Sequence, residues 1–272
     1  MTTTTDRQDT PDRMRFFSQF GEDRLLAEIF SGIGGGTCVE VGGNDGILNS
    51  NTYHFELIGW TTVVVEPIPW LCERIALARP RATVICRAAA EAAGQCEFHV
   101  AVGADGMSSM ADTADLRGQV QREGAHLQTI RVETETLDRI LERAKVDDIH
   151  FLTIDVEGAE MRVLRGLDLA RWKPRIVIVE DNSHGRDGTV VRHLRQQGYA
   201  NVHRTGVNDW FITETDRELA SRFDIATFQR RRSRLWWRYR AGRLAQCIMP
   251  AFLRRRLKRL VGGLPFHEAG DV

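Results

Sequence analysis

Residues Thr37 to Pro67 read TCVEVGGNDGILNSNTYHFELIGWTTVVVEP. The apolar residues of 37–41 predict a short buried strand, and the glycine-rich run after it permits a tight turn whose backbone amides can approach a ligand closely. A second apolar strand, over 61–65, stops at Glu66. A strand, a glycine turn and a second strand that ends in a carboxylate predict a site for a nucleotide-bearing cofactor.

The glycine spacing excludes the dinucleotide fingerprint. Counted from Gly42, the third and sixth positions are Asn44 and Ile47, where the NAD fingerprint needs glycine. The pattern that is present, acidic-x-Gly-x-Asn-x-Gly, resembles the first motif of Rossmann-like S-adenosylmethionine methyltransferases. The alternative is that the glycines only shape the turn between strand and helix.

The length and composition fit one sizeable α/β domain with additional terminal segments, because a chain of 272 residues can bury a core without disulfide bonds or metal ions. The five cysteines are scattered and form no Cys-x-x-Cys pair, so neither a disulfide framework nor a zinc site is indicated. The first fifteen residues are polar and lack the apolar core of a signal peptide. We therefore expect a cytoplasmic protein with reduced thiols.

Strand-like and helical segments alternate along the rest of the chain. Helices are expected over 16–30, 51–57, 71–78, 137–143, 161–169 and 190–197. Further strands are expected over 83–88, 96–102, 129–132, 150–154, 175–179, 200–203 and 210–213, the last pair antiparallel. This alternation predicts an α/β fold with a Rossmann-like, doubly wound, mostly parallel sheet.

Three segments in order resemble the FkbM family of methyltransferases: SQFGED at 18–23, VEVGGNDGILNSNTYHFE at 39–56 and LTIDVEGAEMRVLRGLD at 152–168. The resemblance covers residues 16–214. It implies S-adenosylmethionine-dependent O-methylation of a hydroxyl on a sugar or glycan, or on a polyketide or other secondary metabolite. The domains expected are a disordered leader (1–15), a methyltransferase domain (16–225) and a basic amphipathic extension (226–272).

The resemblance also implies site residues. Asp155 is expected beside the sulfonium of the cofactor. The other cofactor-binding residues it implies are Glu40, Gly42, Gly43, Asn44, Glu66, Gln19 and Ser108.

The acceptor side needs a proton acceptor or a divalent ion, because a sugar hydroxyl is a poor nucleophile near neutral pH. Asp155 follows the strand expected over 150–154, while Asp181 and Asn182 follow the next parallel strand. Oxygen ligands of this kind suit Mg²⁺ or Mn²⁺, so these three residues are the candidate metal ligands. The alternative is that the carboxylates cap helices.

Two more residues are candidates for catalysis. His184 lies on the loop expected to face the acceptor and is the first candidate for the general base; the alternative is a solvated loop histidine. Glu157 is predicted to have a catalytic function, whereas Glu160, in the first turn of a helix, is predicted to be partly structural.

The charge is concentrated at the C-terminal end. Residues 230–260 carry eleven Arg and one Lys with no acid, although the whole chain has zero net charge. Interleaved Trp and Leu favour contact with an anionic membrane surface, placing the protein at the inner face of the membrane. The alternatives for this segment are that it docks on the acidic rest of the chain, residues 1–229, or that it binds nucleic acid. The alternative for the whole protein is a non-enzymatic, membrane-tethered role. Nucleic acid is not favoured as a substrate, because the Asn/Asp-Pro-Pro-Tyr/Phe motif is missing.

Overall fold

The computed structural model describes residues 15–102, 108–110, 117–118, 120–121, 124, 126–183, 185–213 and 215–222. The basic extension expected over 226–272 and all but the last residue of the expected leader lie outside these ranges. In the described part of the chain, no helix combines the length and the apolar character needed to cross a membrane.

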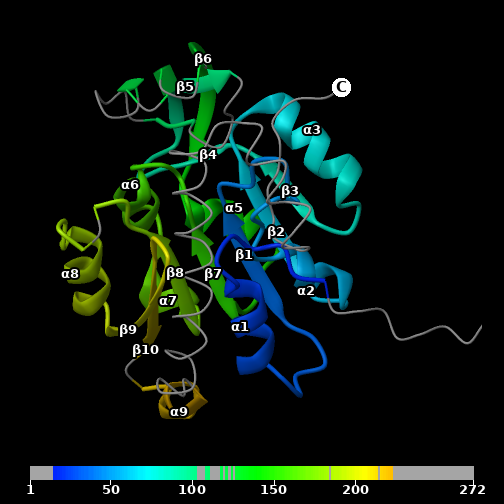
Figure 1. Ribbon diagram of the computed structural model, residues 1–272, viewed down its shortest axis with the longest axis vertical. Helices are drawn as coiled ribbons and strands as arrows, with labels where there is room; N and C mark the ends of the chain where they lie inside the picture. The colour runs from blue at the N-terminus through cyan, green and yellow to red at the C-terminus, as the bar shows by residue number, and fades with distance from the viewer. Residues whose placement is uncertain are drawn as a thin grey trace, which may run out of the picture. The chain divides into compact units, whose positions relative to one another are not determined.

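Helices and strands alternate along the chain, as the sequence predicts (Figure 1). The helices are α1 (Glu22–Ile29), α2 (Tyr53–Leu57), α3 (Pro69–Ala78), α5 (Leu137–Arg143), α6 (Glu160–Arg165), α7 (Leu169–Trp172), α8 (Thr189–Gln196) and α9 (Arg217–Arg222). The strands are β1 (Thr37–Val41), β2 (Thr61–Glu66), β3 (Thr83–Cys86), β4 (Ala88–Ala89), β5 (Gly94–Val102), β6 (His126–Glu135), β7 (Phe151–Ile154), β8 (Ile176–Glu180), β9 (Tyr199–Thr205) and β10 (Asn208–Thr213).

Seven strands form the main sheet, in the order β3-β2-β1-β7-β8-β10-β9. The five strands from β3 to β8 in this order are parallel, whereas β10 is antiparallel to both β8 and β9. From β1 the chain adds strands on one side, and from β7 on the other, so the topological switch point lies between β1 and β7. This is the Rossmann-like, doubly wound, mostly parallel sheet expected from the sequence, including the antiparallel last pair.

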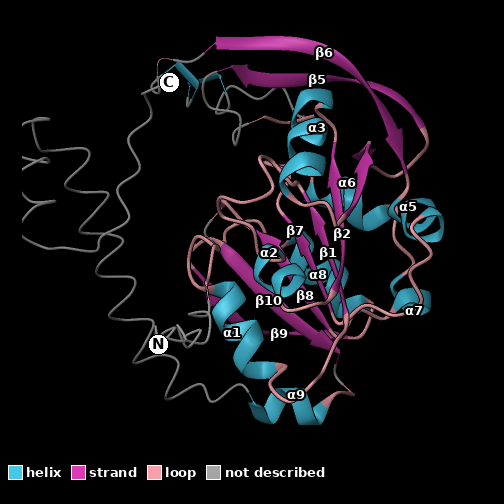
Figure 2. Ribbon diagram, turned by 90° about the vertical axis from the view of Figure 1, so that its right-hand side faces the viewer, coloured by secondary structure: helices cyan, strands magenta, loops and turns pink. Residues whose placement is uncertain are grey.

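The two faces of the sheet bury different side chains, because successive residues of a strand point in opposite directions. Val41, Ile154 and Val179 belong to the large apolar cluster that also contains buried residues of α5 to α8. Figure 2 shows α1 and α3 on one side of the sheet, with α5 and α7 on the other. Glu180, one residue after Val179, therefore belongs to the face covered by α1 to α3.

A second sheet, in the order β4-β6-β5, stands beyond one end of the main sheet (Figures 1 and 2). β5 and β6 form a long antiparallel hairpin, and β4 pairs with β6 in parallel. Phe98 and Val132 of the hairpin pack with Ile68 and Leu71 in a separate apolar cluster. The hairpin is thereby fixed against the start of α3, close to the ends of the parallel strands.

The first helix is shorter than expected. It was predicted over 16–30, but α1 begins only at Glu22, since Gly21 has a φ of +87° and breaks the helical path. The residues before it are held instead by Asp23, whose carboxylate accepts hydrogen bonds from the Ser18 amide at 3.1 Å and the Ser18 hydroxyl at 2.6 Å.

The helix expected over 161–169 is divided into α6 and α7. A Cβ added to Gly166 would lie 2.1 Å from the carbonyl oxygen of Ala90, so the backbone passes close to a segment distant in sequence. Asp168 then starts α7 by accepting the amide of Ala170 at 3.0 Å. The break therefore depends on a tertiary contact.

Candidate active site

β1 and β7 end side by side at the switch point, where the turn after β1 lies against the residue after β7. The Asp155 amide donates to the Val41 carbonyl oxygen at 2.9 Å. Gly42 has a φ of +93°, and a Cβ there would lie 1.8 Å from the Asp155 carbonyl oxygen. A Cβ on Gly43 would lie 2.4 Å from a side-chain carbon of β2. Packing within the protein thus requires both glycines.

Glu66 ends β2, and its carboxylate faces the glycine turn. The Asn44 amide donates to Oε2 at 2.9 Å, and the Ile68 amide donates to Oε1 at 2.9 Å. Asn44 has a left-handed φ of +46°, which lets its amide turn toward Glu66. The carboxylate is therefore oriented at the ends of β1 and β2, where its oxygens can bind neighbouring hydroxyl groups.

Glu40 lies in a buried polar network. Its Oε2 accepts hydrogen bonds from the hydroxyls of Ser50 and Thr52, at 2.8 and 2.7 Å. Arg79, which is fully buried, donates from Nη1 to Glu40 Oε2 at 3.1 Å and from Nε to Glu56 Oε2 at 2.7 Å. Glu40 therefore ties the loop after β1 to α3. Sequence reasoning missed Arg79, because its partners are distant in the sequence.

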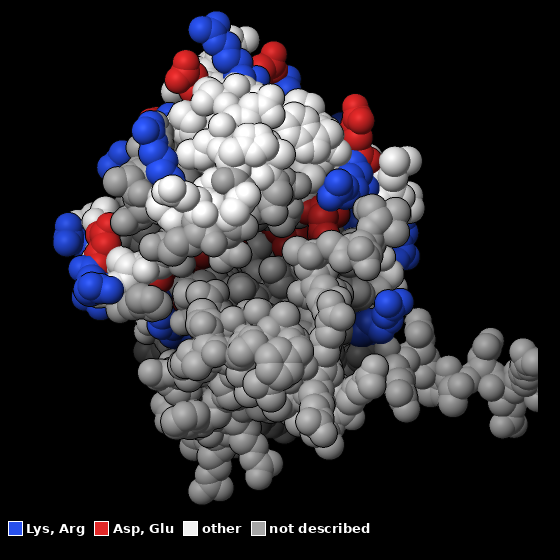
Figure 3. Space-filling model, turned by 45° about the horizontal axis from the view of Figure 1, so that its top comes forward, with Lys and Arg blue, Asp and Glu red and all other residues white. Residues whose placement is uncertain are grey.

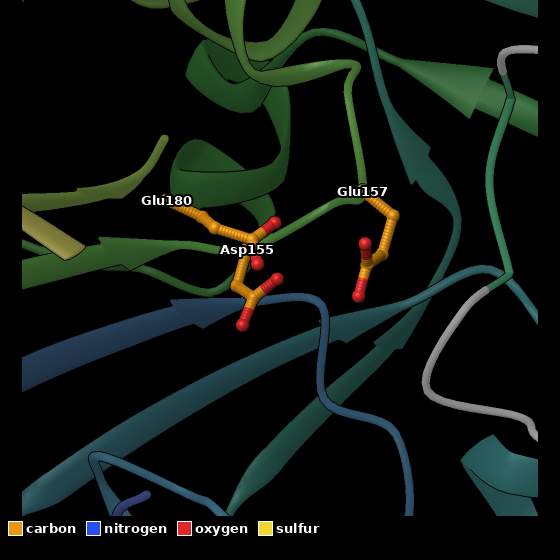
Figure 4. Close-up of side chains that lie close together, drawn as sticks. All are labelled: Asp155, Glu157 and Glu180. Atoms are coloured by element: carbon orange, nitrogen blue, oxygen red, sulfur yellow. The ribbon is translucent and has the colours of Figure 1, made fainter. Parts of the chain in front are cut away.

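Asp155 and Glu180 lie level with each other on neighbouring strands. β7 and β8 are parallel, with Ile154 opposite Val179, so the next residue of each strand falls on the α1 to α3 face. Ligand atoms of Asp155, Glu157 and Glu180 all lie within 4.8 Å of one another. In Figure 4 the three carboxylates point toward a common space. We call these three residues the acidic cluster.

Glu157 joins the acidic cluster from the loop after β7, where the backbone is unusual. Glu157 has a φ of +52° and Gly158 a φ of +96°. The Ser109 hydroxyl donates to the Glu157 carbonyl oxygen at 2.7 Å, and the Gly158 amide donates to Glu160 Oε1 at 2.9 Å. These bonds hold a non-glycine residue in a left-handed conformation, which is costly and typical of functional loops.

Burial raises the pKa of every carboxyl group in the acidic cluster. Desolvation is the largest cause for each, and the charge of Asp155 raises the pKa of Glu157 and Glu180 further. Glu180 is only 8% exposed; its carboxyl group forms a hydrogen bond with that of Asp155, while its Oε2 has no partner. The largest causes of these pKa shifts are burial and neighbouring carboxyl groups, and no described Lys or Arg is among them.

The acidic cluster extends from the interior toward solvent. Glu180 is buried, Glu157 is half-buried and Asp155 is exposed. Part of Asp155 is accessible to solvent. Its carboxyl group is nevertheless surrounded by protein, and this desolvation raises its pKa. Figure 3 shows acidic and basic side chains next to one another along the outer edge of one face, with further acidic atoms nearer its centre.

Comparison with known proteins identifies the family. A sequence model described as the methyltransferase FkbM domain matches residues 40–200, more than half of the chain. The chain belongs to the FkbM methyltransferase family. Among solved structures it is similar to a TehB-like SAM-dependent methyltransferase from Corynebacterium glutamicum, with 9% identity and a TM-score of 0.39 over 72% of this chain and 88% of that chain. No curated protein matches the chain.

This FkbM methyltransferase is therefore dependent on S-adenosylmethionine, and the residues at the switch point fit that cofactor. The Glu66 carboxylate is oriented at the end of β2 by two backbone amides, and its contact with the ribose hydroxyls stays a prediction. The acidic cluster suits a positively charged sulfonium, since none of the described cationic side chains neutralises it. Glu40 is held by Arg79 and two hydroxyls, which fixes the loop after β1, and its contact with the cofactor stays a prediction.

The predicted ligand Asp181 lies apart from the acidic cluster. Asp181 Oδ2 accepts from Arg204 Nη1 at 2.9 Å, and Asp181 Oδ1 accepts from the Ser183 amide at 2.9 Å. Desolvation alone would raise the pKa of Asp181, but these hydrogen bonds keep it below its usual value. Glu180 takes the place beside Asp155 instead. The sequence interpretation ended the strand at residue 179 and passed over Glu180, which β8 includes.

The structure places Asn182 and Glu160, two of the other residues considered on the acceptor side, but does not describe His184. Asn182 Nδ2 lies 3.5 Å from Glu157 Oε2, so Asn182 borders the acidic cluster. His184, the predicted general base, lies outside the described residues. Glu160 accepts from the loop amide of Gly158, in agreement with a structural role.

Gln19 and Ser108 lie on the two segments that flank the ends of the strands. Gln19 is exposed and follows Ser18, which bridges to Asn49 in the loop after β1. Ser108 is buried, and its hydroxyl accepts the amide of Ala101 at 3.1 Å. Their contacts with the cofactor stay predictions.

Proposed function

We propose that this FkbM methyltransferase transfers the methyl group to a hydroxyl oxygen of a sugar or glycan. The observation that carries the proposal is the acidic cluster at the ends of β7 and β8, next to the glycine turn after β1. Carboxylates accept hydrogen bonds from hydroxyl groups, and a saccharide presents several hydroxyls at once. A cluster of three carboxyl groups therefore suits a polyhydroxylated acceptor.

Methyl transfer of this kind depends mainly on alignment of the acceptor oxygen with the methyl group. When bound, S-adenosylmethionine supplies an electrophilic methyl group. Glu66 holds its ribose side, while Asp155 and Glu157 orient the acceptor hydroxyl on the other side of the switch point. His184 remains the predicted general base. Mg²⁺ or Mn²⁺ also stays part of the proposal, with Glu180 in place of Asp181 as a ligand.

A second candidate function is O-methylation of a polyketide or another hydroxylated metabolite, since the acidic cluster would bind its hydroxyl in the same way. Incubation of the full-length enzyme with isotope-labelled S-adenosylmethionine and a panel of saccharides, lipid-linked glycans and hydroxylated metabolites separates the two. Label on a saccharide oxygen supports the first function, and label only on a small metabolite supports the second. Cofactor binding without transfer to any acceptor would favour a non-enzymatic role.

The basic segment 230–260 is proposed to contact an anionic membrane surface, which would bring the enzyme to a lipid-linked acceptor at the inner membrane face. The test compares the full chain with a chain ending at Ile225 in sedimentation with anionic liposomes at physiological salt. Binding that needs the segment supports membrane contact. Equal behaviour of the two chains contradicts it and favours docking on the body or a nucleic-acid arm.

A further inference from the structure

We propose that Asp155, Glu157 and Glu180 form a binding site for one divalent cation, which holds acceptor oxygens during methyl transfer. The inference rests on the proposed function for the role of the ion, but the site itself follows from the geometry. All three ligand atoms lie within 4.8 Å of one another, and they come from β8 and from the end of β7 with its following loop.

The separation of the oxygens is suitable for a metal ion. Two ligands on opposite sides of one Mg²⁺ lie about 4.2 Å apart, and those of Ca²⁺ about 4.8 Å apart. At most one pair of three ligands can lie on opposite sides of an ion, and adjacent ligands of Mg²⁺ lie about 3 Å apart, so a bound ion would draw the three carboxylates closer together. Their ligand set consists of oxygen alone, which selects hard cations such as Mg²⁺, Mn²⁺ or Ca²⁺ over zinc or copper.

An unpaired buried oxygen of the cluster gives further support. Glu180 is 8% exposed and comes from a strand of the main sheet, yet its Oε2 has no hydrogen-bond partner. An unsatisfied buried carboxylate oxygen is costly, so a native structure normally pairs it with a donor or an ion. Figure 4 shows the Glu180 side chain reaching toward Asp155, so an ion at the common space would satisfy it.

The charges of the site point to a divalent ion in addition to the cofactor. Three carboxyl groups converge, and no described Lys or Arg neutralises them. The sulfonium of the bound cofactor supplies a single positive charge. A divalent cation at the common space would stabilise the ionised form of these carboxyl groups and would also lower the pKa of a hydroxyl bound to it.

The loop before α6 is built to keep Glu157 at this position. Glu157 has a left-handed φ of +52°. Its conformation is held by the hydrogen bond from the Ser109 hydroxyl to the Glu157 carbonyl oxygen and by the hydrogen bond from the Gly158 amide to Glu160. Glu180 is fixed by the β8 ladder, so two of the three ligands have little freedom. Preorganised ligands of this kind reduce the entropy lost when an ion binds.

The test is a titration of metal-free, full-length enzyme with Mn²⁺, in which free Mn²⁺ is followed by electron paramagnetic resonance. We expect one saturable site in the wild type. Glu180→Gln and Asp155→Asn should each weaken Mn²⁺ binding by at least about tenfold. Glu73→Gln, which removes an exposed acid on α3, should leave the affinity unchanged. Urea unfolding of each variant checks that it is folded.

The absence of saturable Mn²⁺ binding in a wild type that binds S-adenosylhomocysteine overturns the site, as does equal affinity in all four proteins. Methyl transfer that continues unchanged in excess chelator also overturns the site and removes the metal ion from the proposed function, but it leaves methylation of a hydroxyl standing. Conversely, Mn²⁺ binding that depends on Glu180, without transfer to any hydroxyl acceptor, supports the site and contradicts the proposed function.

Discussion

The carboxyl groups of Asp155 and Glu180 lie side by side because β7 and β8 are parallel and in register, with Ile154 opposite Val179. Side chains alternate between the two faces of a sheet, so a shift of one residue moves a side chain to the other face. Asp181 accordingly pairs with Arg204 instead of joining Asp155. The register of two strands thus selects which acid faces the switch point.

Substitution of Glu180 should therefore affect mainly the rate of methyl transfer, whereas substitution of Asp181 should affect mainly the free energy of unfolding. Glu180→Gln should lower the rate of methyl transfer by about 10–100-fold, because the proposed cation site that aligns the acceptor oxygens loses one of its three ligands. Asp181→Asn should instead lower the free energy of unfolding by about 1–3 kcal/mol, because it weakens the bonds to Arg204 and Ser183. Steady-state kinetics and urea unfolding of both variants measure the two effects. A larger loss of activity in Asp181→Asn would contradict this assignment.

Glu66→Gln should weaken binding of S-adenosylmethionine by at least about tenfold. One oxygen of the carboxylate would become a donor and would face the Asn44 or Ile68 amide, so the residue would lose both its orientation and an acceptor for the ribose. Isothermal titration calorimetry measures the affinity, and Glu73→Gln serves as the control. Unchanged affinity in Glu66→Gln would place the ribose elsewhere.

Arg79 should be required for stability. Arg79→Met would leave Glu40 and Glu56 buried without their positive partner, which costs about 3–5 kcal/mol in the free energy of unfolding. Adding Glu40→Gln and Glu56→Gln to the same chain should restore part of the loss. Urea denaturation measures these differences, with the exposed Arg74→Met as the control. A cost below about 1 kcal/mol would mean that Arg79 is not the anchor of the loop.

Much of this organisation could be predicted from the sequence, because local signals determine it. The helix over 137–143 was predicted with the bounds of α5, where apolar periodicity agrees with the Thr136 cap. The two strands that flank the glycine turn and the antiparallel last pair were also predicted correctly.

The features that escaped prediction depend on contacts between distant residues. The break between α6 and α7 results from the approach of Gly166 to Ala90. Arg79 is buried by partners 23 and 39 positions away, and nothing near it in the sequence marks it as a core residue. Glu180 was missed because the end of a strand cannot be located to a single residue from its apolar pattern.

The N-terminal segment offers a test by pH. Glu22 is buried and accepts hydrogen bonds from Thr205 at 2.7 Å and Asn208 at 2.9 Å, yet desolvation raises its pKa above 4.5. The folded state then binds the proton more tightly than the unfolded state, so this group stabilises the fold at low pH. Its contribution is lost as pH rises through the raised folded pKa.

Relative to Glu22→Gln, the wild type should therefore lose stability as pH rises from about 4 through the pKa of the folded state. Urea unfolding of both proteins across this pH range measures the difference. A difference that stays constant with pH, or that grows in favour of the wild type, would show that the hydrogen bonds to Thr205 and Asn208 outweigh desolvation.

The most direct measurement is the identity of the atom that receives the methyl group. The full-length enzyme is incubated with methyl-¹³C S-adenosylmethionine and the saccharide panel, and the product is analysed by carbon NMR and mass spectrometry. We predict a labelled methyl carbon bonded to a saccharide oxygen, with the signal reduced in Glu180→Gln and retained in Glu73→Gln. A labelled methyl on nitrogen or carbon, or an oxygen-bound label of equal intensity in both variants, would contradict a hydroxyl site at Asp155, Glu157 and Glu180.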